Sequence, residues 1–495
     1  MHIRNFTIDS DEQVVVKVLR EVLDLYRISV ADEDSAIFDE IAVRNETTEG
    51  NPLRVRTEAV FVGADGTMMR RSTEDIAREG ENPRSERHRL IKLNFYKLLR
   101  EELSLPQAPW GILYGVRPSK IVHRWLDAGL SRDEIMERLR EDYGVGEDKA
   151  ALLVDSSIYQ RPFLGQSDSR TVSIYAGIPF CPSRCLYCSF PAFVLPGEKM
   201  LRRFTEVFFR DLAAAREAVA QYGFRVQNLY VGGGTPTSLP DDVFDEVLRT
   251  LHKSFASDAL VEFCVEAGRP DSMTPAKLES MMRYQVNRVS ANPQTMQMRT
   301  LQRIGRRHEP EDIVRMYNDL RTAGIPCVNM DVIIGLPGED ARDVEDTMEK
   351  IADLAPDDVT LHALALKKGS RLKENLSETE LPDDETAREM FTVAMDYTKR
   401  MGLTPYYLYR QGYQSGQLEN VGCCRPGAES MYNIQIMGER QTILGIGGAA
   451  TSKIVSPTQK YLKTSFNPKE ITVYLDKVDE YIAKRARLLQ EVYGK

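Results

Sequence analysis

The sequence predicts an α/β protein whose centre is a partial (β/α)6 barrel, a shortened relative of the TIM barrel, with an α/β domain before it and an α+β cap after it. From residue 169 onward, apolar strand-like runs alternate with amphipathic helical runs, which is the pattern of a parallel sheet built from βαβ crossovers. The unusual residues follow the strand-like runs, where barrels carry their catalytic loops.

With 495 residues, the chain is longer than one hydrophobic core ordinarily serves, so we expect more than one domain. We expect an N-terminal α/β accessory domain at 1–168, the barrel at 169–370 and a C-terminal cap or substrate domain at 371–495. The chain has 42% hydrophobic and 28% charged residues, and it lacks both a long apolar run and an apolar signal core at its start. These features favour a soluble, cytoplasmic protein without a membrane span.

Charge and cysteine usage narrow the class of ligand. A formal net charge of −9 argues against a general nucleic-acid binder and favours a small organic substrate. The seven cysteines are an odd number, and three of them are clustered. This usage favours a metal site in a reducing compartment over a disulfide framework.

In the N-terminal domain, apolar spacing predicts a helix at 11–28 and a basic helix at 85–104, and alternation predicts a strand at 52–62. Ser131 with Glu134 three residues later forms a helix-capping pattern. We assign this domain no chemistry.

The barrel region is expected to contain six strands and the helices between them. The strand-like runs lie near 172–178, 228–231, 260–266, 286–291, 326–334 and 358–366, and the helical runs near 198–222, 240–254, 274–284, 309–323 and 339–353. In the cap we expect a helix at 384–402, a strand at 404–411, a loop at 419–433, a glycine-rich turn at 443–453 and a helical end.

The most informative motif lies in the stretch YAGIPFCPSRCLYCSF. Cys181, Cys185 and Cys188 have C-x-x-x-C-x-x-C spacing, so one loop can bring three thiolates to one inorganic centre. A structural zinc site takes four protein ligands, whereas a 4Fe-4S cluster held by three thiolates leaves one iron open. The alternatives are packed cysteines or a zinc loop completed by a distant residue. The remaining candidates for a fourth ligand are far away in sequence: Cys264, Cys327, Cys423, Cys424 and His252.

Cys423 and Cys424 are adjacent in the chain. We interpret them as two packed thiols in preference to a redox pair or ligands of an auxiliary metal.

Further motifs follow the other predicted strands. GGGTPT at 232–237 follows strand 2, Glu266 ends strand 3, NPQ at 292–294 follows strand 4, and DVIIGLPGE at 331–339 ends strand 5. Because the strands are parallel, all these motifs share one face with the cysteine loop.

From Tyr175 to about Lys453 the chain resembles the oxygen-independent coproporphyrinogen III oxidase/dehydrogenase family of radical S-adenosylmethionine (SAM) enzymes. The forms VEAGRP, NPQTM, IGRRH and NMDVIIGLPGE, together with the N-terminal extension, are most similar to its HemZ-like branch. The resemblance implies that Cys181, Cys185 and Cys188 hold a 4Fe-4S cluster, and that an electron from the cluster cleaves SAM to a 5′-deoxyadenosyl radical.

The resemblance also implies a set of cofactor-binding residues. Tyr187 takes the aromatic position near adenine, and Tyr175 and Arg306 are implied near the reacting centre. The positions that match the family's SAM-binding residues are Tyr175, Gly233, Gly234, Thr235, Glu266, Gln294, Arg306 and Asp331. Carboxylates at 266 and 331 can accept from the ammonium or ribose hydroxyls of SAM, and Arg306 can fork a carboxylate.

Three positions depart from the family. Gly177 replaces the histidine of its HIPFC motif, so a proton-handling role there does not transfer. Phe190 stands where the oxidase branch often has a cysteine, a form shared with the haem-chaperone branch. Tyr432 replaces the histidine of that branch's HNxxYW motif, which weakens a chaperone interpretation.

Three functions fit these motifs: decarboxylation of coproporphyrinogen III in haem biosynthesis, haem binding or delivery, and methyl transfer to haem or a related tetrapyrrole, which would use a second SAM. The implied partners are a tetrapyrrole and an electron donor such as flavodoxin or ferredoxin. Cationic candidates for the substrate carboxylates are Arg299, Arg303, Lys367, Lys368, Arg371 and Arg410.

Overall fold

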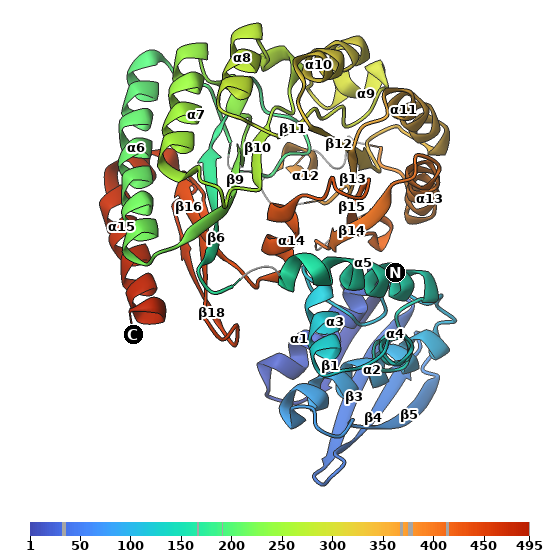
Figure 1. Ribbon diagram of the computed structural model, residues 1–495. Helices are drawn as coiled ribbons and strands as arrows, with labels where there is room; N and C mark the ends of the chain where they lie inside the picture. Colours follow the sequence, from blue (N-terminus) through green and yellow to red (C-terminus); the bar gives the residue numbers. More distant parts are fainter. Residues whose placement is uncertain are drawn as a thin grey trace. The chain divides into compact units, whose positions relative to one another are not determined.

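The computed structural model describes residues 1–31, 36–165, 168–190, 192–366, 370–374, 380–411 and 415–494. It forms two compact units, Met1–Asp155 and Ser156–Lys495 (Figure 1). The three-domain division drawn from the sequence stays a prediction. Within the described ranges, no helix has both the length and the apolar character needed to cross a membrane.

The first unit is a five-stranded sheet with helices packed against it. Its strand order is β2-β1-β3-β4-β5, with β1 parallel to its two neighbours and β3, β4 and β5 successively antiparallel. The strands are β1 (His2–Asp9), β2 (Ser29–Val30), β3 (Phe38–Thr48), β4 (Arg54–Val62) and β5 (Met68–Ile76), and the helices are α1 (Gln13–Leu25), α2 (Pro83–Glu102), α3 (Ser119–Asp127) and α4 (Arg132–Tyr143). The two helices and the strand expected here are confirmed as α1, α2 and β4.

The core of this unit follows from alternation along β4. Val55, Ala59 and Phe61 are fully buried and belong to one apolar cluster with Phe95 of α2, because alternate strand side chains share a face. The expected cap of α4 is also confirmed, since Ser131 Oγ accepts from the Glu134 backbone N–H and the Glu134 carboxylate accepts from the Ser131 backbone N–H. Helix α5 (Glu147–Gly165) follows.

The second unit is organised around six parallel strands, as the sequence predicts. They are adjacent in the order β6-β9-β10-β11-β12-β13. Their bounds are β6 (Thr171–Ile178), β9 (Arg225–Gly233), β10 (Glu262–Glu266), β11 (Arg288–Ser290), β12 (Cys327–Ile334) and β13 (Asp358–Ala363). All six carboxyl ends therefore lie at one edge of the sheet, which carries the site.

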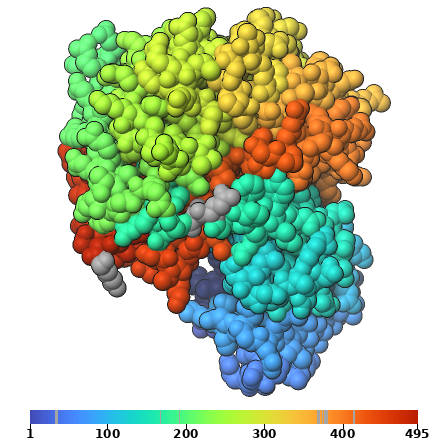
Figure 2. All heavy atoms as spheres, viewed as in Figure 1, coloured from blue at the N-terminus to red at the C-terminus, as the bar shows by residue number. Residues whose placement is uncertain are grey.

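Amphipathic helices connect these strands and cover their outer face (Figure 1). They are α6 (Glu198–Gln221), α7 (Asp241–Phe255), α8 (Pro275–Arg283), α9 (Met298–Arg303), α10 (Pro310–Ala323) and α11 (Ala341–Leu354). In the space-filling view of the same face, the green to orange atoms of these segments hide the strands (Figure 2). Each helix buries its apolar stripe, as Phe244, Leu248 and Leu251 of α7 illustrate.

The C-terminal region corrects two expectations. The segment expected as a loop at 419–433 contains β15 (Asn420–Cys424) and α14 (Met431–Gly438), and the expected glycine-rich turn is two strands, β16 (Thr442–Gly447) and β17 (Thr451–Val455). The glycines serve packing inside strands. A Cβ at Gly422 would lie 1.9 Å from the Tyr407 ring, and one at Gly445 would lie 2.7 Å from the Thr451 backbone.

These C-terminal strands extend the central sheet at both edges. β15 pairs antiparallel with β13 and with β14 (Thr404–Tyr409), the strand expected at 404–411. β16 pairs parallel with β6, and β17 and β18 (Leu462–Phe466) follow it. The expected helix at 384–402 is α13 (Asp384–Arg400), and α15 (Ile471–Tyr493), the expected helical end, lies beside α6 (Figure 1).

Candidate active site

The three clustered cysteines lie in the connection between β6 and α6. Two short strands, β7 (Phe180–Cys181) and β8 (Phe193–Val194), pair within this connection and bracket the cysteine loop. The loop turns tightly between its last two cysteines, where the Cys188 N–H donates to the Cys185 carbonyl at 3.3 Å. The Leu186 N–H also donates to the Ile304 carbonyl at 2.9 Å, so the chain after β11 holds the loop.

The glycine motif after β9 supports the cysteine loop directly. The Thr235 N–H donates to the Phe180 carbonyl at 2.6 Å, and Thr235 Oγ1 lies 3.4 Å from Cys181 Sγ. A Cβ built on Gly234 would stand 2.5 Å from the Phe180 carbonyl oxygen. Gly234 therefore lets the motif pack against the backbone before Cys181, and the contact of this glycine with SAM stays a prediction.

Burial keeps two thiols of the loop, Cys181 and Cys188, protonated in the absence of iron. Burial raises the pKa of Cys181 to about 11 and also raises the pKa of Cys188. Metal binding would release these protons. In the described part of the chain, no three His, Cys, Asp or Glu side chains are close enough to hold a single ion. Each thiolate of a 4Fe-4S cluster binds its own iron, and this loop supplies three free cysteines for that role.

The remaining cysteines lie on the sheet and not in the loop. Cys264 is on β10, Cys327 is on β12, and Cys423 and Cys424 are on β15. Burial raises the pKa of Cys423 to about 12, which keeps this thiol neutral at pH 7.

Arg306 lies beside the cysteine loop and is only 8% exposed. Its Nη1 donates to the carbonyls of Gly268 and Asn292 at 2.6 and 2.9 Å, and its Nη2 lies 3.1 Å from the Tyr187 hydroxyl. Nε is buried without a partner. These contacts use three of the five guanidinium N–H donors, so Nε–H and one Nη2–H remain for a ligand, and the fork on a carboxylate stays a prediction.

A cavity of about 360 Å³, here called the cysteine-side cavity, opens on this loop. Four of the predicted site residues line it, namely Tyr187, Cys188, Gln294 and Asp331. Gln294 has a left-handed backbone with φ 65°, and its N–H donates to the Asp331 carbonyl at 2.9 Å. Its side-chain Oε1 is buried without a partner. An orphaned amide oxygen in a cavity that Cys188 also lines fits a ligand with N–H or O–H donors.

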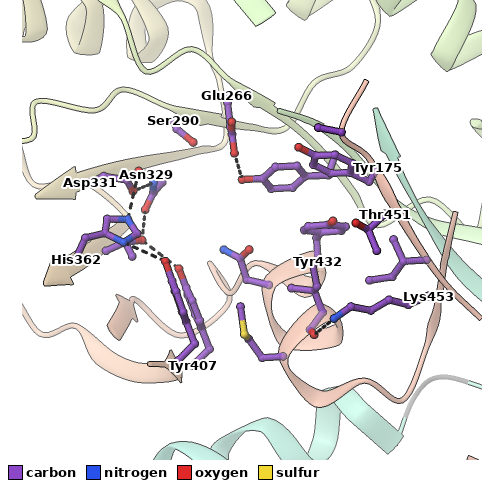
Figure 3. Close-up of a pocket in the computed structure, with 18 residues that line it drawn as sticks. Tyr175, Glu266, Ser290, Asn329, Asp331, His362, Tyr407, Tyr432, Thr451 and Lys453 are labelled. Atoms are coloured by element: carbon purple, nitrogen blue, oxygen red, sulfur yellow. Dashed lines mark hydrogen bonds and ion pairs between the residues drawn. The ribbon is translucent and has the colours of Figure 1, made fainter. Parts of the chain in front are cut away.

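A second cavity of about 370 Å³, here called the lumen cavity, lies among the strands (Figure 3). Tyr175, Glu266 and Asp331 of the predicted set line it. Two further tyrosines face Tyr175, with ring centroids 6.0 Å away for Tyr230 and 6.1 Å away for Tyr432. The Tyr230 and Tyr432 rings stack at 4.3 Å. This aromatic wall suits a flat or apolar ligand group.

Helix α14 carries Tyr432 into this wall because its N-terminus is anchored to β10. The buried Glu262 carboxylate accepts from the backbone N–H groups of Met431 and Tyr432 at 3.0 and 3.1 Å and from Ser430 Oγ at 3.2 Å. A carboxylate is favourable at a helix N-terminus. Arg288 pairs with Glu262 at 3.1 Å and with Asp358 at 2.9 Å, so the negative charge of the buried Glu262 carboxylate has a cationic partner.

The two cavities share Asp331, His362 and Tyr409. His362 Nε2 lies 3.6 Å from Asp331 Oδ2, and the Tyr409 hydroxyl lies 3.3 Å from His362 Nδ1. Although burial favours the neutral acid, His362 and Asn329 hold the pKa of Asp331 below its usual value. Sequence reasoning missed His362 and Tyr409. The sequence places each of these residues near the end of a predicted strand, but that position alone does not show which side chains they contact.

Glu266 ends β10, and its carboxyl lines the lumen cavity (Figure 3). The Tyr230 hydroxyl donates to Oε1 at 2.7 Å and the Gly233 N–H donates to Oε2 at 3.1 Å. Burial raises the pKa of Glu266 to about 7, since these two hydrogen bonds only partly oppose it and Asp331 adds to it. The group therefore titrates near neutral pH.

We expect SAM to bind more tightly as the pH rises through about 7. Below this pH Glu266 is neutral and loses the charge-assisted hydrogen bond to a SAM donor, so affinity should fall by up to about tenfold per pH unit. Equilibrium binding of SAM to reconstituted protein at pH 6, 7 and 8 measures this. Glu266→Gln should bind weakly with a flat profile, and equal wild-type affinity at pH 6 and 8 would exclude the role.

The cations suggested for substrate carboxylates do not gather at either cavity. Arg299 is exposed and pairs with Asp343 at 2.5 Å, Arg371 is exposed on α12 (Arg371–Glu374), and Arg410 is buried after β14. Neither these three nor Arg303 line the cavities formed by the described residues. Lys367 and Lys368 lie outside the described residues.

Comparison with known proteins agrees with this architecture. The family model of the Radical SAM superfamily matches residues 175–351. The oxygen-independent coproporphyrinogen-III oxidase-like protein HemZ of Bacillus subtilis is 36% identical over 410 residues, which cover 82% of this chain and 81% of that protein. The heme chaperone HemW of Lactococcus lactis is 26% identical over 330 residues, covering 65% of this chain and 80% of that protein.

A solved structure supports the fold. Coproporphyrinogen III oxidase (HemN) of Escherichia coli, described as a radical SAM enzyme, matches with a TM-score of 0.52 and 21% identity, covering 66% of this chain and 72% of that one.

Proposed function

We propose, from the premise that this chain belongs to the oxygen-independent coproporphyrinogen III oxidase-like branch of the radical SAM superfamily, that it converts coproporphyrinogen III to protoporphyrinogen IX by oxidative decarboxylation. The cofactors of the family are a 4Fe-4S cluster and SAM. The observation that carries the proposal is the three-cysteine loop opening on one cavity, with a tyrosine-lined cavity beyond a shared wall.

The chain's own residues would hold the cofactors. Together the two cofactors supply a 5′-deoxyadenosyl radical. Cys181, Cys185 and Cys188 would hold the cluster. Gln294, with its orphaned Oε1, and Asp331, which is held ionised, would accept hydrogen bonds from SAM.

The proposed reaction removes one hydrogen atom from the carbon of a propionate that is attached to the pyrrole ring. The carboxylate then leaves as carbon dioxide, one electron passes to an external one-electron acceptor, and a vinyl group remains. Two propionates react in turn. This sequence needs no acid or base from the protein, so positioning in a dry cavity is the main contribution of the chain. The buried tyrosine wall around Tyr432 supports that role.

A haem-binding function is the second candidate, because HemW relatives match 65% and 59% of this chain. The position that carries histidine in the HNxxYW motif is Tyr432 here. Tyr432 is 5% exposed and stacked on Tyr230, and burial raises its pKa, so the phenol is neutral. This arrangement supports a wall of a substrate cavity more than an axial ligand for iron.

Anaerobic incubation of reconstituted protein with SAM, a reductant and coproporphyrinogen III, followed by product masses, tests the proposal. We expect a monovinyl intermediate and then a product lighter by two formic-acid equivalents, with 5′-deoxyadenosine formed alongside. Protein carrying Cys185→Ala is the matched blank. A methylated tetrapyrrole would identify a methyltransferase, and stable haem binding without turnover, in protein that still cleaves SAM, would favour the carrier.

Two further parts of the proposal follow from the same chemistry. Reduction of the cluster needs a one-electron donor, for which we propose a flavodoxin or ferredoxin. We also propose the cytosol as the location, because the thiols must stay reduced to bind iron. Replacing dithionite with purified flavodoxin and its reductase in the same assay tests the donor.

A further inference from the structure

Arg269 is a buried cation that contacts a cysteine of the loop. It follows β10 and precedes the 3-10 helix Pro270–Ser272, and it is only 3% exposed. Its Nη1 lies 3.5 Å from Cys185 Sγ, and its Nη2 donates to Ser183 Oγ at 3.0 Å. The guanidinium therefore reaches the loop between its first two cysteines from the neighbouring strand end.

The orientation of this guanidinium is fixed by Asp271. Nε donates to Asp271 Oδ1 at 3.0 Å and Nη2 donates to Oδ2 at 2.9 Å. A bidentate pair of this kind fixes both distance and plane. Nη1 is the nitrogen left outside the fork, and it is the one that faces the sulfur. The nearby Arg306 is directed instead at two carbonyls and Tyr187.

We propose that Arg269 is a positioning residue that donates a hydrogen bond to the Cys185 thiolate of the bound cluster and raises the cluster's reduction potential. Reduction adds one negative charge to the cluster and its thiolates. A buried cation that donates to a thiolate stabilises the reduced form more than the oxidised form, since hydrogen bonds to the sulfurs set the potential of such clusters. The inference concerns the cluster alone and holds whichever tetrapyrrole is the substrate.

The test is a redox titration of the anaerobic holoprotein, followed by the electron paramagnetic resonance signal of the reduced cluster. Arg269→Met keeps an unbranched apolar side chain at this buried position and removes the charge and the donors. We expect near wild-type iron and sulfide and an equilibrium constant for reduction about tenfold lower, which is a downward shift of about 59 mV for one electron. Arg269→Lys keeps the charge without the fork and should recover part of the shift.

Asp271→Asn supplies a test of opposite sign. It removes the negative charge that offsets Arg269, while the Asn oxygen and Ser183 Oγ still accept hydrogen bonds from the guanidinium, so the potential should rise. Arg249→Met is the control, because Arg249 is exposed on α7 and pairs with Glu246. If the Arg269→Met protein fails to load iron, the reduction potentials of the Arg269→Lys and Asp271→Asn proteins test the proposal instead. Wild-type potentials in the fully loaded variants at 269 and 271 would overturn the proposal.

Discussion

Cys185→Ala should leave the anaerobically reconstituted protein without its 4Fe-4S cluster, and Cys181→Ala and Cys188→Ala should do the same. A cluster held by three thiolates with one open iron has no ligand to spare. Among the described residues, the other four cysteines lie on β10, β12 and β15 and not in the loop. The loss should be nearly complete, and SAM cleavage under dithionite should vanish with it.

Iron and sulfide analysis, together with the visible absorption of the cluster, measures this loss. Cys423→Ala and Cys424→Ala are the matched controls, because these thiols are fully buried in β15 and should leave cluster content unchanged. Full cluster content in the Cys185→Ala protein would contradict the assignment of the loop.

Gly234→Val should disrupt both the cluster and SAM cleavage. A Cβ at this position would stand 2.5 Å from the Phe180 carbonyl oxygen and 2.9 Å from its carbon, and Phe180 directly precedes Cys181. Because these are backbone atoms, the cysteine strand must move, at a cost of about 1–3 kcal/mol or more. We expect most of the iron to be lost, and with it the formation of 5′-deoxyadenosine.

Gly197→Val is the matched control for this prediction. Gly197 caps α6 with an extended backbone, and a Cβ there would meet no atom within 4 Å. The variant should load iron and cleave SAM as the wild type does. If Gly234→Val protein held a full cluster but failed to bind SAM, the motif would contact the cofactor as the sequence first suggested, and the packing role would be wrong.

The six-stranded core was predictable because local periodicity determines it. Strand-like runs such as 326–334 and helical runs such as 309–323 correspond to β12 and α10 within one or two residues. The cysteine spacing and the position of Glu266 at the end of β10 likewise predicted a site at one edge of the sheet. Each of these signals lies within a short stretch of chain.

Features that depend on distant pairing were not predictable. β15 and β16 contain glycines that read as turns, and only the neighbouring Tyr407 ring and Thr451 backbone explain why small residues occupy strands. In the sequence, nothing distinguished Arg269 of the VEAGRP segment from other charged residues. Its contact with Cys185 joins positions 84 residues apart, which no local pattern records.

Transfer of deuterium tests the central claim most directly. The substrate is coproporphyrinogen III that carries deuterium at the propionate carbons attached to the ring. It is incubated anaerobically with the reconstituted protein, and the deuterium content of the 5′-deoxyadenosine formed is measured by mass spectrometry. The account predicts one deuterium in each 5′-deoxyadenosine, in step with each vinyl group formed. Unlabelled 5′-deoxyadenosine, with the tetrapyrrole recovered unchanged, would contradict it.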